Sequence, residues 1–202
     1  MKTIYLATKN AHKVGEFAAL LQPLSVSVQP LPDGVPDCPE TGTTFESNAM
    51  QKASFYAAYC DSWVLADDSG LCVDWLHGAP GVHSARYAGV HGDSAANNEK
   101  LLRALNGVPE SERNAQFVCV LALYHRRYGT GYVARGEVHG RIALQPSGQS
   151  GFGYDPLFYV PELGCTFGDL PTDVKNSVSH RAKAVQVLTQ LWRGAEDEAV
   201  HR

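Results

Sequence analysis

The sequence predicts an α/β domain in which helices cover a mixed β-sheet. Strand and helix patterns alternate along the chain, no repeat or low-complexity tract interrupts them, and 202 residues are enough for one sizeable core. A composition of 44% hydrophobic and 19% charged residues is typical of a soluble globular enzyme. We therefore expect a single domain over residues 1–202, built as two lobes, with a polar and frayed tail at about 196–202.

The N-terminal elements follow from hydrophobic periodicity and capping signals. Residues 4–7 predict a strand, and the polar turn at residues 8–10 leads into a helix whose apolar face carries Val14, Phe17, Leu20 and Leu21. Thr43 and Glu46 have the spacing of a capping box, which predicts a second helix through about Tyr59.

The segment VLADDSG, residues 64–70, runs from apolar residues into two adjacent carboxylates. We interpret it as a buried strand, 64–66, that ends in an acidic turn and is followed by another strand at 71–76. Ionised acids are costly to bury unless they are paired, hydrogen-bonded or bound to a metal. A core strand that ends in this way therefore indicates that Asp67 and Asp68 are delivered to a functional site.

The remaining elements continue the alternation. A glycine-rich loop, 78–92, precedes a helix at 94–105, and the strongly apolar strand 117–124 turns at Gly129–Gly131 into a strand at 132–138. A final helix from about Ser177 to Trp192 has Ala182, Val185, Leu188 and Trp192 facing inward, with Gly194 ending it.

Charge and cysteine content narrow the class of protein. A net charge of -4 argues against a broad nucleic-acid-binding surface but permits local cations that hold one small anionic ligand. The five cysteines contain no C-x-x-C pair and are interpreted as reduced thiols rather than a metal or redox site. With no signal peptide and no stretch of membrane-spanning length, we expect a cytoplasmic protein without a membrane partner.

Two polar clusters suit a polyphosphate. Residues 8–13, TKNAHK, lie where a strand meets a helix, and free N–H groups, the helix dipole and two lysines favour a phosphate there. Glu40 precedes the second helix, on which Asn48 and Lys52 are four residues apart and share a face. The structural alternatives are solvated lysines at a helix start and a capped surface helix.

The other two clusters suit a metal and a base. Magnesium is typically held by one or two carboxylates together with water and phosphates, which Glu40 and one aspartate of the acidic segment supply. In the segment SGFGYDP, residues 150–156, glycines flank Phe152, so Phe152 or Tyr154 can stack on a flat ligand. The alternatives are a solvated turn for the aspartates and a tight turn with aromatic core residues for the second segment.

Six blocks in this order resemble the inosine/xanthosine triphosphate pyrophosphatase family, also called Ham1-like. They are the residues of 8–13, Glu40-Thr-Gly with Phe45, Asn48 and Lys52, ADDSG at 66–70, GAPG at 78–81 with SARY at 84–87, GFGYDP at 151–156, and SHR at 179–181. The resemblance spans nearly the whole chain. It implies a long, bent mixed β-sheet with flanking helices, two lobes around a central cleft, and a homodimer.

The resemblance also implies magnesium-dependent hydrolysis of ITP, dITP and XTP to the monophosphate and pyrophosphate. It makes Asp68 the catalytic base and, with Glu40, a ligand of Mg2+. It assigns the triphosphate to Thr8, Lys9, Asn10, Ala11, His12, Lys13, Lys52 and Ser69, and the nucleoside to Phe152, Gly153, Tyr154, Asp155, Lys175, His180 and Arg181. Lys9 departs from the glycine that many relatives carry, so tight backbone wrapping around phosphate is in question there.

Base selection follows from donors and acceptors. Inosine and xanthosine present a 6-keto acceptor where adenine presents a 6-amino donor, and arginine only donates, so Arg181 or backbone N–H groups favour the keto bases. Three other functions remain open at this point. They are a pyrophosphatase for modified pyrimidine or methylated nucleotides, a nucleotide sensor without turnover, and a nucleic-acid-binding role that the acidic balance disfavours.

Overall fold

The chain divides into two compact units. A computed structural model describes residues 2–8 and 10–200. The first unit comprises residues 1–68, 119–136 and 181–202, and the second comprises residues 69–118 and 137–180. The predicted cleft between two lobes stays a prediction.

The strands form a mixed sheet with the order β2-β1-β3-β4-β5-β6-β7. β1 pairs in parallel with β2 and β3, whereas β6 pairs in antiparallel fashion with β5 and β7. The strands are β1 Thr3–Leu6, β2 Ser27–Pro30, β3 Trp63–Val73, β4 Asn114–His125, β5 Thr130–Ile142, β6 Phe158–Val160 and β7 Cys165–Thr166. The predicted α/β class with a mixed sheet and flanking helices is confirmed.

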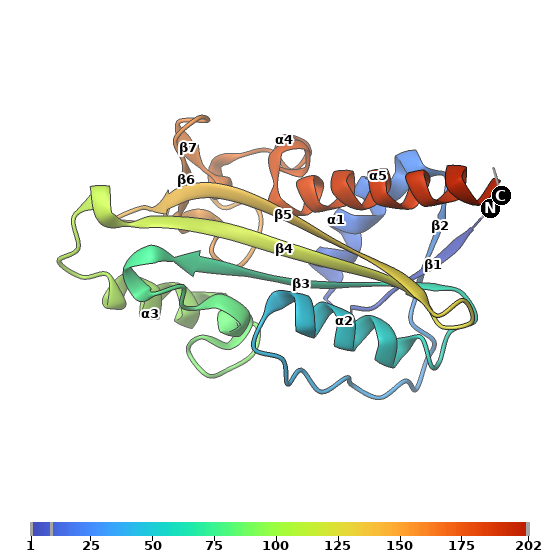
Figure 1. The fold of residues 1–202 in the computed structure, drawn as a ribbon. Coiled ribbons are helices and arrows are strands. Elements are labelled where there is room, and N and C mark those ends of the chain that lie inside the picture. Colours follow the sequence, from blue (N-terminus) through green and yellow to red (C-terminus); the bar gives the residue numbers. More distant parts are fainter. Residues whose placement is uncertain (1, 9, 201–202) are drawn as a thin grey trace. The chain divides into compact units, whose positions relative to one another are not determined.

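Three helices flank the strands of the first unit: α1 Ala11–Leu21, α2 Phe45–Tyr56 and α5 His180–Val200. Figure 1 shows α1 and α5 on one side of these strands and α2 on the other. Phe17 and Leu21 of α1 and Leu188 and Trp192 of α5 join one apolar cluster with strand residues such as Leu65. This confirms the predicted inward faces, with the difference that Val14 is exposed.

The second unit has its own core. The helices α3 Ser94–Ala104 and α4 Thr172–Val178 accompany short 3-10 turns such as Gly81–Arg86 and Asp155–Leu157. Leu101 and Leu105 pack with Phe158 and Phe167 in a cluster of fully buried apolar side chains. The ring centroids of Phe117 and Phe158 lie 4.4 Å apart, which anchors β4 to β6 in this unit.

The acidic segment was predicted to be a turn between two strands, and that prediction is wrong. β3 runs without interruption through Asp67 and Asp68 as an eleven-residue strand. Both aspartates are almost fully buried, at 4% and 6% exposure. The chain has no need to turn toward solvent there, because side chains from other elements neutralise both carboxylates inside the fold.

Two helix ends also differ from the predictions. The capping box of α2 uses Thr44 and Ser47, one residue beyond the predicted pair, because the Thr44 hydroxyl accepts from Ser47 N–H and Ser47 returns the bond. α5 does not end at Gly194 but continues to Val200. One glycine costs a helix only about 1 kcal/mol, and the alanine and glutamate residues that follow favour helix.

No disulfide joins the five cysteines, all of which lie in the described part of the chain. Within residues 2–8 and 10–200, none of the helices is long and apolar enough to cross a membrane.

Candidate active site

The two aspartates of β3 have different partners. Successive residues of a strand point to opposite faces, so Asp67 and Asp68 reach different elements. Asp68 contacts Asn48 and Lys52 of α2, while Asp67 contacts Lys13 of α1. Two neighbouring acids are thereby placed in two distinct electrostatic environments.

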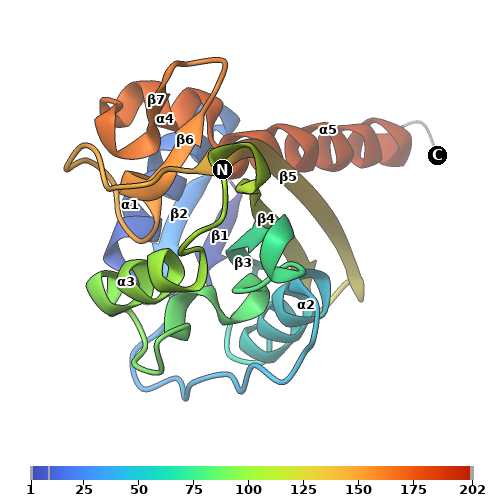
Figure 2. The ribbon, with the colours of Figure 1, turned by 90° about the vertical axis from the view of Figure 1, so that its left-hand side faces the viewer.

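Glu40 and Asp68 converge on one ammonium group. Lys52 Nζ lies 3.1 Å from Asp68 Oδ1 and 3.3 Å from Glu40 Oε1, so these two oxygens cannot be separated by more than the sum of those distances. Glu40 comes from the segment 31–44, which runs alongside α2 in Figure 2. Three contacts tie that segment to the helix: Tyr56 with Cys38, Gln51 with Thr41, and Asn48 with Gly42.

The donor set at Lys52 fits a hard divalent cation. Two carboxylates meet at one positive charge, and carboxylate oxygens are the ligands that Mg2+ prefers. Within residues 2–8 and 10–200, no group of three or more His, Cys, Asp or Glu side chains is arranged to hold a metal. A cation at this place would therefore draw its other ligands from water and a bound phosphate.

Asp67 forms an ion pair with Lys13, whose ammonium contacts Asp67 Oδ1. The thiol of Cys119 lies 3.6 Å from the other carboxylate oxygen. Nearby in the same unit, Arg181 Nη1 donates to Glu16 Oε2 over 2.9 Å, and both side chains are largely buried. Two cationic residues predicted to contact substrate are thus each paired with an acid of the first unit.

These surroundings separate the pKa values of the acidic pair. Burial alone raises the pKa of Asp67, but the charges of Lys13, Arg181 and Lys52 together hold it well below its usual value. For Asp68, burial raises the pKa and outweighs the attraction of Lys52, with the neighbouring Asp67 charge adding to the rise. Asp67 therefore stays ionised, while Asp68 is the better proton acceptor of the two.

Lys52 offsets part of the negative charge of this cluster. Its burial lowers its pKa, yet Asp68, Asp67 and Glu40 raise it further, so the net shift is upward. The ammonium consequently remains protonated at neutral pH.

The predicted phosphate-binding turn has local order. Thr8 Oγ1 accepts from Asn10 N–H over 3.1 Å, and Asn10 Oδ1 lies 3.4 Å from Lys13 N at the start of α1. Ala11 and His12 form the first residues of that helix, and Lys9 lies outside the described residues. Ser69 follows Asp68 along β3 and belongs to the second unit.

Most residues predicted to contact the nucleoside lie in the second unit. Asp155 Oδ2 accepts hydrogen bonds of 2.7 Å from both Lys175 Nζ and Phe152 N–H. Lys175 Nζ also lies 5.0 Å from the centroid of the Phe152 ring. Gly153, which adopts a positive φ of 63°, turns the chain between Phe152 and the buried Asp155.

Tyr154 and His180 are packed into the second unit. The Tyr154 hydroxyl donates to Ser84 O over 2.8 Å, and burial raises the pKa of this phenol far above its usual value. The His180 ring stacks on Phe117 with centroids 4.8 Å apart. Of the two aromatic residues predicted to stack on a base, Phe152 is the one with partial exposure, whereas Tyr154 is buried.

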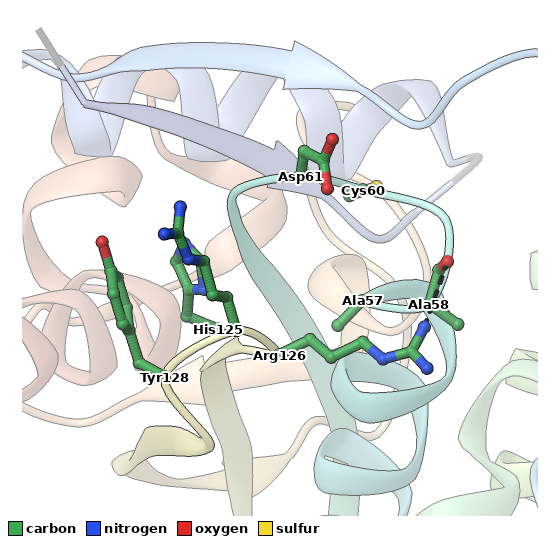
Figure 3. A pocket seen from close by; sticks show the side chains of 8 residues that line it. Ala57, Ala58, Cys60, Asp61, His125, Arg126 and Tyr128 are labelled. Carbon is green, nitrogen blue, oxygen red and sulfur yellow. Dashed lines mark hydrogen bonds between the residues drawn. The ribbon is translucent and has the colours of Figure 1, made fainter.

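A pocket of about 690 Å³ in the first unit contains none of the predicted site residues. Figure 3 shows it between the end of α2 and the β4–β5 turn, lined by Ala57, Ala58, Cys60, Asp61, His125, Arg126, Arg127 and Tyr128. Arg126 reaches across to Ala58 O at 3.5 Å. The pocket has one carboxylate, Asp61, and so lacks the converging acids found at Lys52.

Sequence reasoning missed the contacts of Asn48 and Asp67. The spacing of Asn48 and Lys52 on one helix face was a signal that both side chains face the same partner, and both indeed contact Asp68. Nothing in the local sequence indicates the pairing of Asp67 with Lys13, because 54 positions separate them.

Comparison with known proteins identifies the family. A sequence model of the Ham1 family matches residues 4–191. The chain belongs to the Ham1 family. A relative from Geobacillus kaustophilus, named dITP/XTP pyrophosphatase, is 50% identical over 194 residues, covering 95% of each chain.

Solved structures of similar proteins have the same fold. A Ham1 protein from Coxiella burnetii is 40% identical and superposes with a TM-score of 0.87 over 96% of this chain and 100% of its own. A nucleoside-triphosphatase, also described as a dITP/XTP pyrophosphatase, from Mycobacterium abscessus is 40% identical with a TM-score of 0.75, covering 92% and 97% of the two chains.

Proposed function

We propose that this Ham1-family chain hydrolyses non-canonical purine nucleoside triphosphates, namely dITP, XTP and ITP, to the nucleoside monophosphate and pyrophosphate. The observation that carries the proposal is the convergence of Glu40 and Asp68 on Lys52. It is supported by the 50% identity to a dITP/XTP pyrophosphatase over nearly the full length of both chains.

The proposal includes Mg2+ as the metal. Glu40 and Asp68 would hold it, and when bound it supplies positive charge that offsets the repulsion between a triphosphate and an incoming water. Their carboxylates face one point from different elements, the segment 31–44 and β3, so neither needs a large movement to share a ligand.

Asp68 is the proposed general base. Its raised pKa makes it a stronger proton acceptor than an ordinary aspartate, and its ionised neighbour Asp67 favours the uptake of a proton. A water oxygen forms the new bond to the α-phosphorus while its proton passes to an Asp68 carboxylate oxygen. The bond between the α-phosphorus and the bridging oxygen breaks, and the electron pair leaves with pyrophosphate.

Lysines of the first unit are proposed to bind the phosphates. Lys52 lies beside the base, and Lys13 stands at the start of α1 with 19% of its side chain exposed. Lys13 is held by Asp67, and a phosphate oxygen would share its ammonium with that carboxylate. Such cations act by position and charge, which is the main contribution a protein makes to phosphoryl transfer.

The proposed preference for 6-keto purines over adenine rests on stacking and hydrogen bonding. The Phe152 ring offers a face on which a purine can stack, and N–H donors favour a 6-keto base over adenine. A polar site that must pair a substrate group discriminates by roughly four to five orders of magnitude, whereas shape alone gives about two.

Hydrolysis in oxygen-18 water tests the proposal. With dITP, XTP and Mg2+ we expect pyrophosphate and a monophosphate that carries the label, with ATP turned over far more slowly. Labelled inorganic phosphate with a diphosphate as co-product would overturn the pyrophosphatase mechanism. Equal turnover of ATP would overturn the purine selectivity, and faster turnover of a modified pyrimidine triphosphate would reassign the substrate.

The homodimer, the cytoplasmic location and the absence of nucleic-acid binding stay predictions. Sedimentation equilibrium of the purified chain tests the first of these directly.

A further inference from the structure

Asn48 connects the metal-binding candidates to the loop that carries one of them. Its side chain is 1% exposed and lies on α2, one turn before Lys52. Asn48 Nδ2 donates to Asp68 Oδ2 over 3.1 Å, and Asn48 Oδ1 accepts from Gly42 N–H over 2.8 Å. Neither contact belongs to the roles proposed above.

The chemistry of the partners fixes the orientation of the Asn48 amide. A backbone N–H can only donate and an ionised carboxylate can only accept, so the oxygen must face Gly42 and the nitrogen must face Asp68. The loop packs closely against this amide, since a Cβ at Gly42 would lie 2.6 Å from Asn48 Oδ1 and 2.2 Å from Ser47 Oγ. Residue 42 therefore has no room for a side chain beside this amide.

The two oxygens of Asp68 consequently have separate partners. Oδ2 is taken by Asn48, and Oδ1 faces Lys52, whose ammonium also faces Glu40. Without Asn48, Lys52 alone would hold the carboxylate, whose terminal torsion is broad and weakly restricted. The hydrogen bond therefore fixes the plane of the carboxylate and with it the direction in which the second oxygen points.

We propose that Asn48 is a positioning residue that holds Asp68 Oδ2 and thereby keeps Oδ1 directed at the point shared by Lys52 and Glu40. This inference rests on the proposed pyrophosphatase function for its kinetic consequences. Outer partners of this kind, which orient a ligand without touching substrate, change affinity or rate by about 10- to 100-fold when removed.

The chain offers a matched control for the competing explanation that Asn48 only anchors the loop. Gln51 lies on the same helix and holds the adjacent loop residue, with Gln51 Oε1 accepting from Thr41 N–H over 3.1 Å. Gln51 Nε2 also donates to Thr41 Oγ1 over 3.1 Å. Gln51→Ala therefore loosens the loop without removing a donor to Asp68.

An isosteric variant separates the two halves of the amide. Asn48→Asp keeps an oxygen that accepts from Gly42 N–H, but it replaces the donor to Asp68 with a second carboxylate oxygen at the same place. A loop anchor survives this change, whereas a positioning donor is lost and replaced by repulsion.

The experiment compares Asn48→Asp, Asn48→Ala and Gln51→Ala with the wild type in steady-state hydrolysis of dITP, with melting temperatures confirming that each variant folds. We expect kcat to fall at least about tenfold in both Asn48 variants with KM changed less than about threefold, and Gln51→Ala to stay within about twofold of wild type. Wild-type kcat in Asn48→Asp, or equal losses in Asn48→Ala and Gln51→Ala, would overturn the inference.

A measurement without substrate keeps the inference independent of the proposed function. Titration of the substrate-free proteins with Mn2+ alone, followed by electron paramagnetic resonance of the free ion, should show about tenfold weaker binding by Asn48→Ala and unchanged binding by Gln51→Ala. Equal Mn2+ affinity of Asn48→Ala and wild type would refute the positioning role. If the wild type releases no pyrophosphate from dITP or XTP, the proposed function fails while this comparison still decides the role of Asn48.

Discussion

In the first unit Lys52 contacts the carboxylates of Asp68 and Glu40, whereas in the second unit Lys175 forms a buried ion pair with Asp155. Lys175 and Asp155 are each 3% exposed and lie 2.7 Å apart, with Phe152 N–H completing the pair. At Lys52 the distances are longer and one acid, Glu40, keeps 33% of its side chain exposed. The pair in the second unit is closed and satisfied, and the cluster in the first unit has an excess of negative charge that solvent can reach.

This difference indicates two uses of the same residue types. A closed buried pair fixes a chain segment, here the turn that carries Phe152, and breaking it costs stability. An accessible cluster with more acid than base retains affinity for a further cation and suits chemistry. The predictions below test that distinction, starting with the largest expected effect.

Asp68→Asn should abolish most of the activity. Loss of the base, together with one proposed cation ligand, should lower kcat for pyrophosphate release from dITP by about 10³-fold. The matched control is Asp61→Asn, which alters an acid of the pocket in Figure 3 and should leave kcat unchanged. Wild-type turnover by Asp68→Asn would show that the acidic cluster of the first unit does not take part in catalysis.

Lys175→Met should destabilise the fold by about 3 kcal/mol, because it leaves the buried Asp155 carboxylate without its counter-charge. Urea unfolding measures this loss. The double variant Asp155→Asn with Lys175→Met removes both charges and should recover part of it. If the single variant is as stable as wild type, the pair in the second unit is not the closed structural contact described above.

Glu40→Gln should lower activity with little loss of stability, in contrast to Lys175→Met. The free energy of unfolding should change by less than about 1 kcal/mol, because the ion pair of Glu40 with Lys52 is one-third exposed at the acid. The value of kcat/KM for dITP should nevertheless fall by at least about tenfold. The distinction between the two clusters fails if the variant loses stability but keeps its activity.

The smallest expected effect, on the melting temperature, comes from a variant of Asp169. This residue is a purely structural acid of the second unit. It accepts from Ser147 Oγ, Thr166 N–H and Thr166 Oγ1, and these hydrogen bonds lower its pKa from the usual 3.8. Because the folded pKa is depressed, this stabilisation is present above pH 3.8 and is lost as the pH falls through the lower folded value. Asp169→Ala should therefore lower the melting temperature by about 2 °C at pH 7, and the difference should shrink in acid. A difference that does not vary with pH would contradict the role of the carboxylate.

The regular parts of the fold could be predicted from the sequence because they depend on local periodicity. Val185, Leu188 and Trp192 recur at helical spacing, and all three are buried on α5. The continuity of β3 could not be predicted in this way. A strand passes through two adjacent aspartates only because Lys13 and Lys52, which come from two separate helices, neutralise them.

The sequence predicts which residues form the candidate site better than it predicts which side chains contact one another. The motifs around Glu40, Lys52 and Asp68 placed those residues together, and the structure brings the two carboxylates to the Lys52 ammonium. The different partners of Asp67 and Asp68 depend on which strand face each occupies, whereas the local sequence predicts a turn there. The role of Asn48 depends on one hydrogen bond between a helix and a strand, which no local pattern specifies.

The position of Lys52 has a consequence for how the protein matures. Its ammonium is a counterion within the polypeptide, so Glu40 of the segment 31–44 and Asp68 of β3 can be brought together during folding without any ion from the medium. The chain should accordingly reach its native state in the presence of a strong chelator and keep its melting temperature there. Removal of the metal would then abolish turnover while the protein stays folded. Adding the metal back would restore turnover at once, with no refolding step.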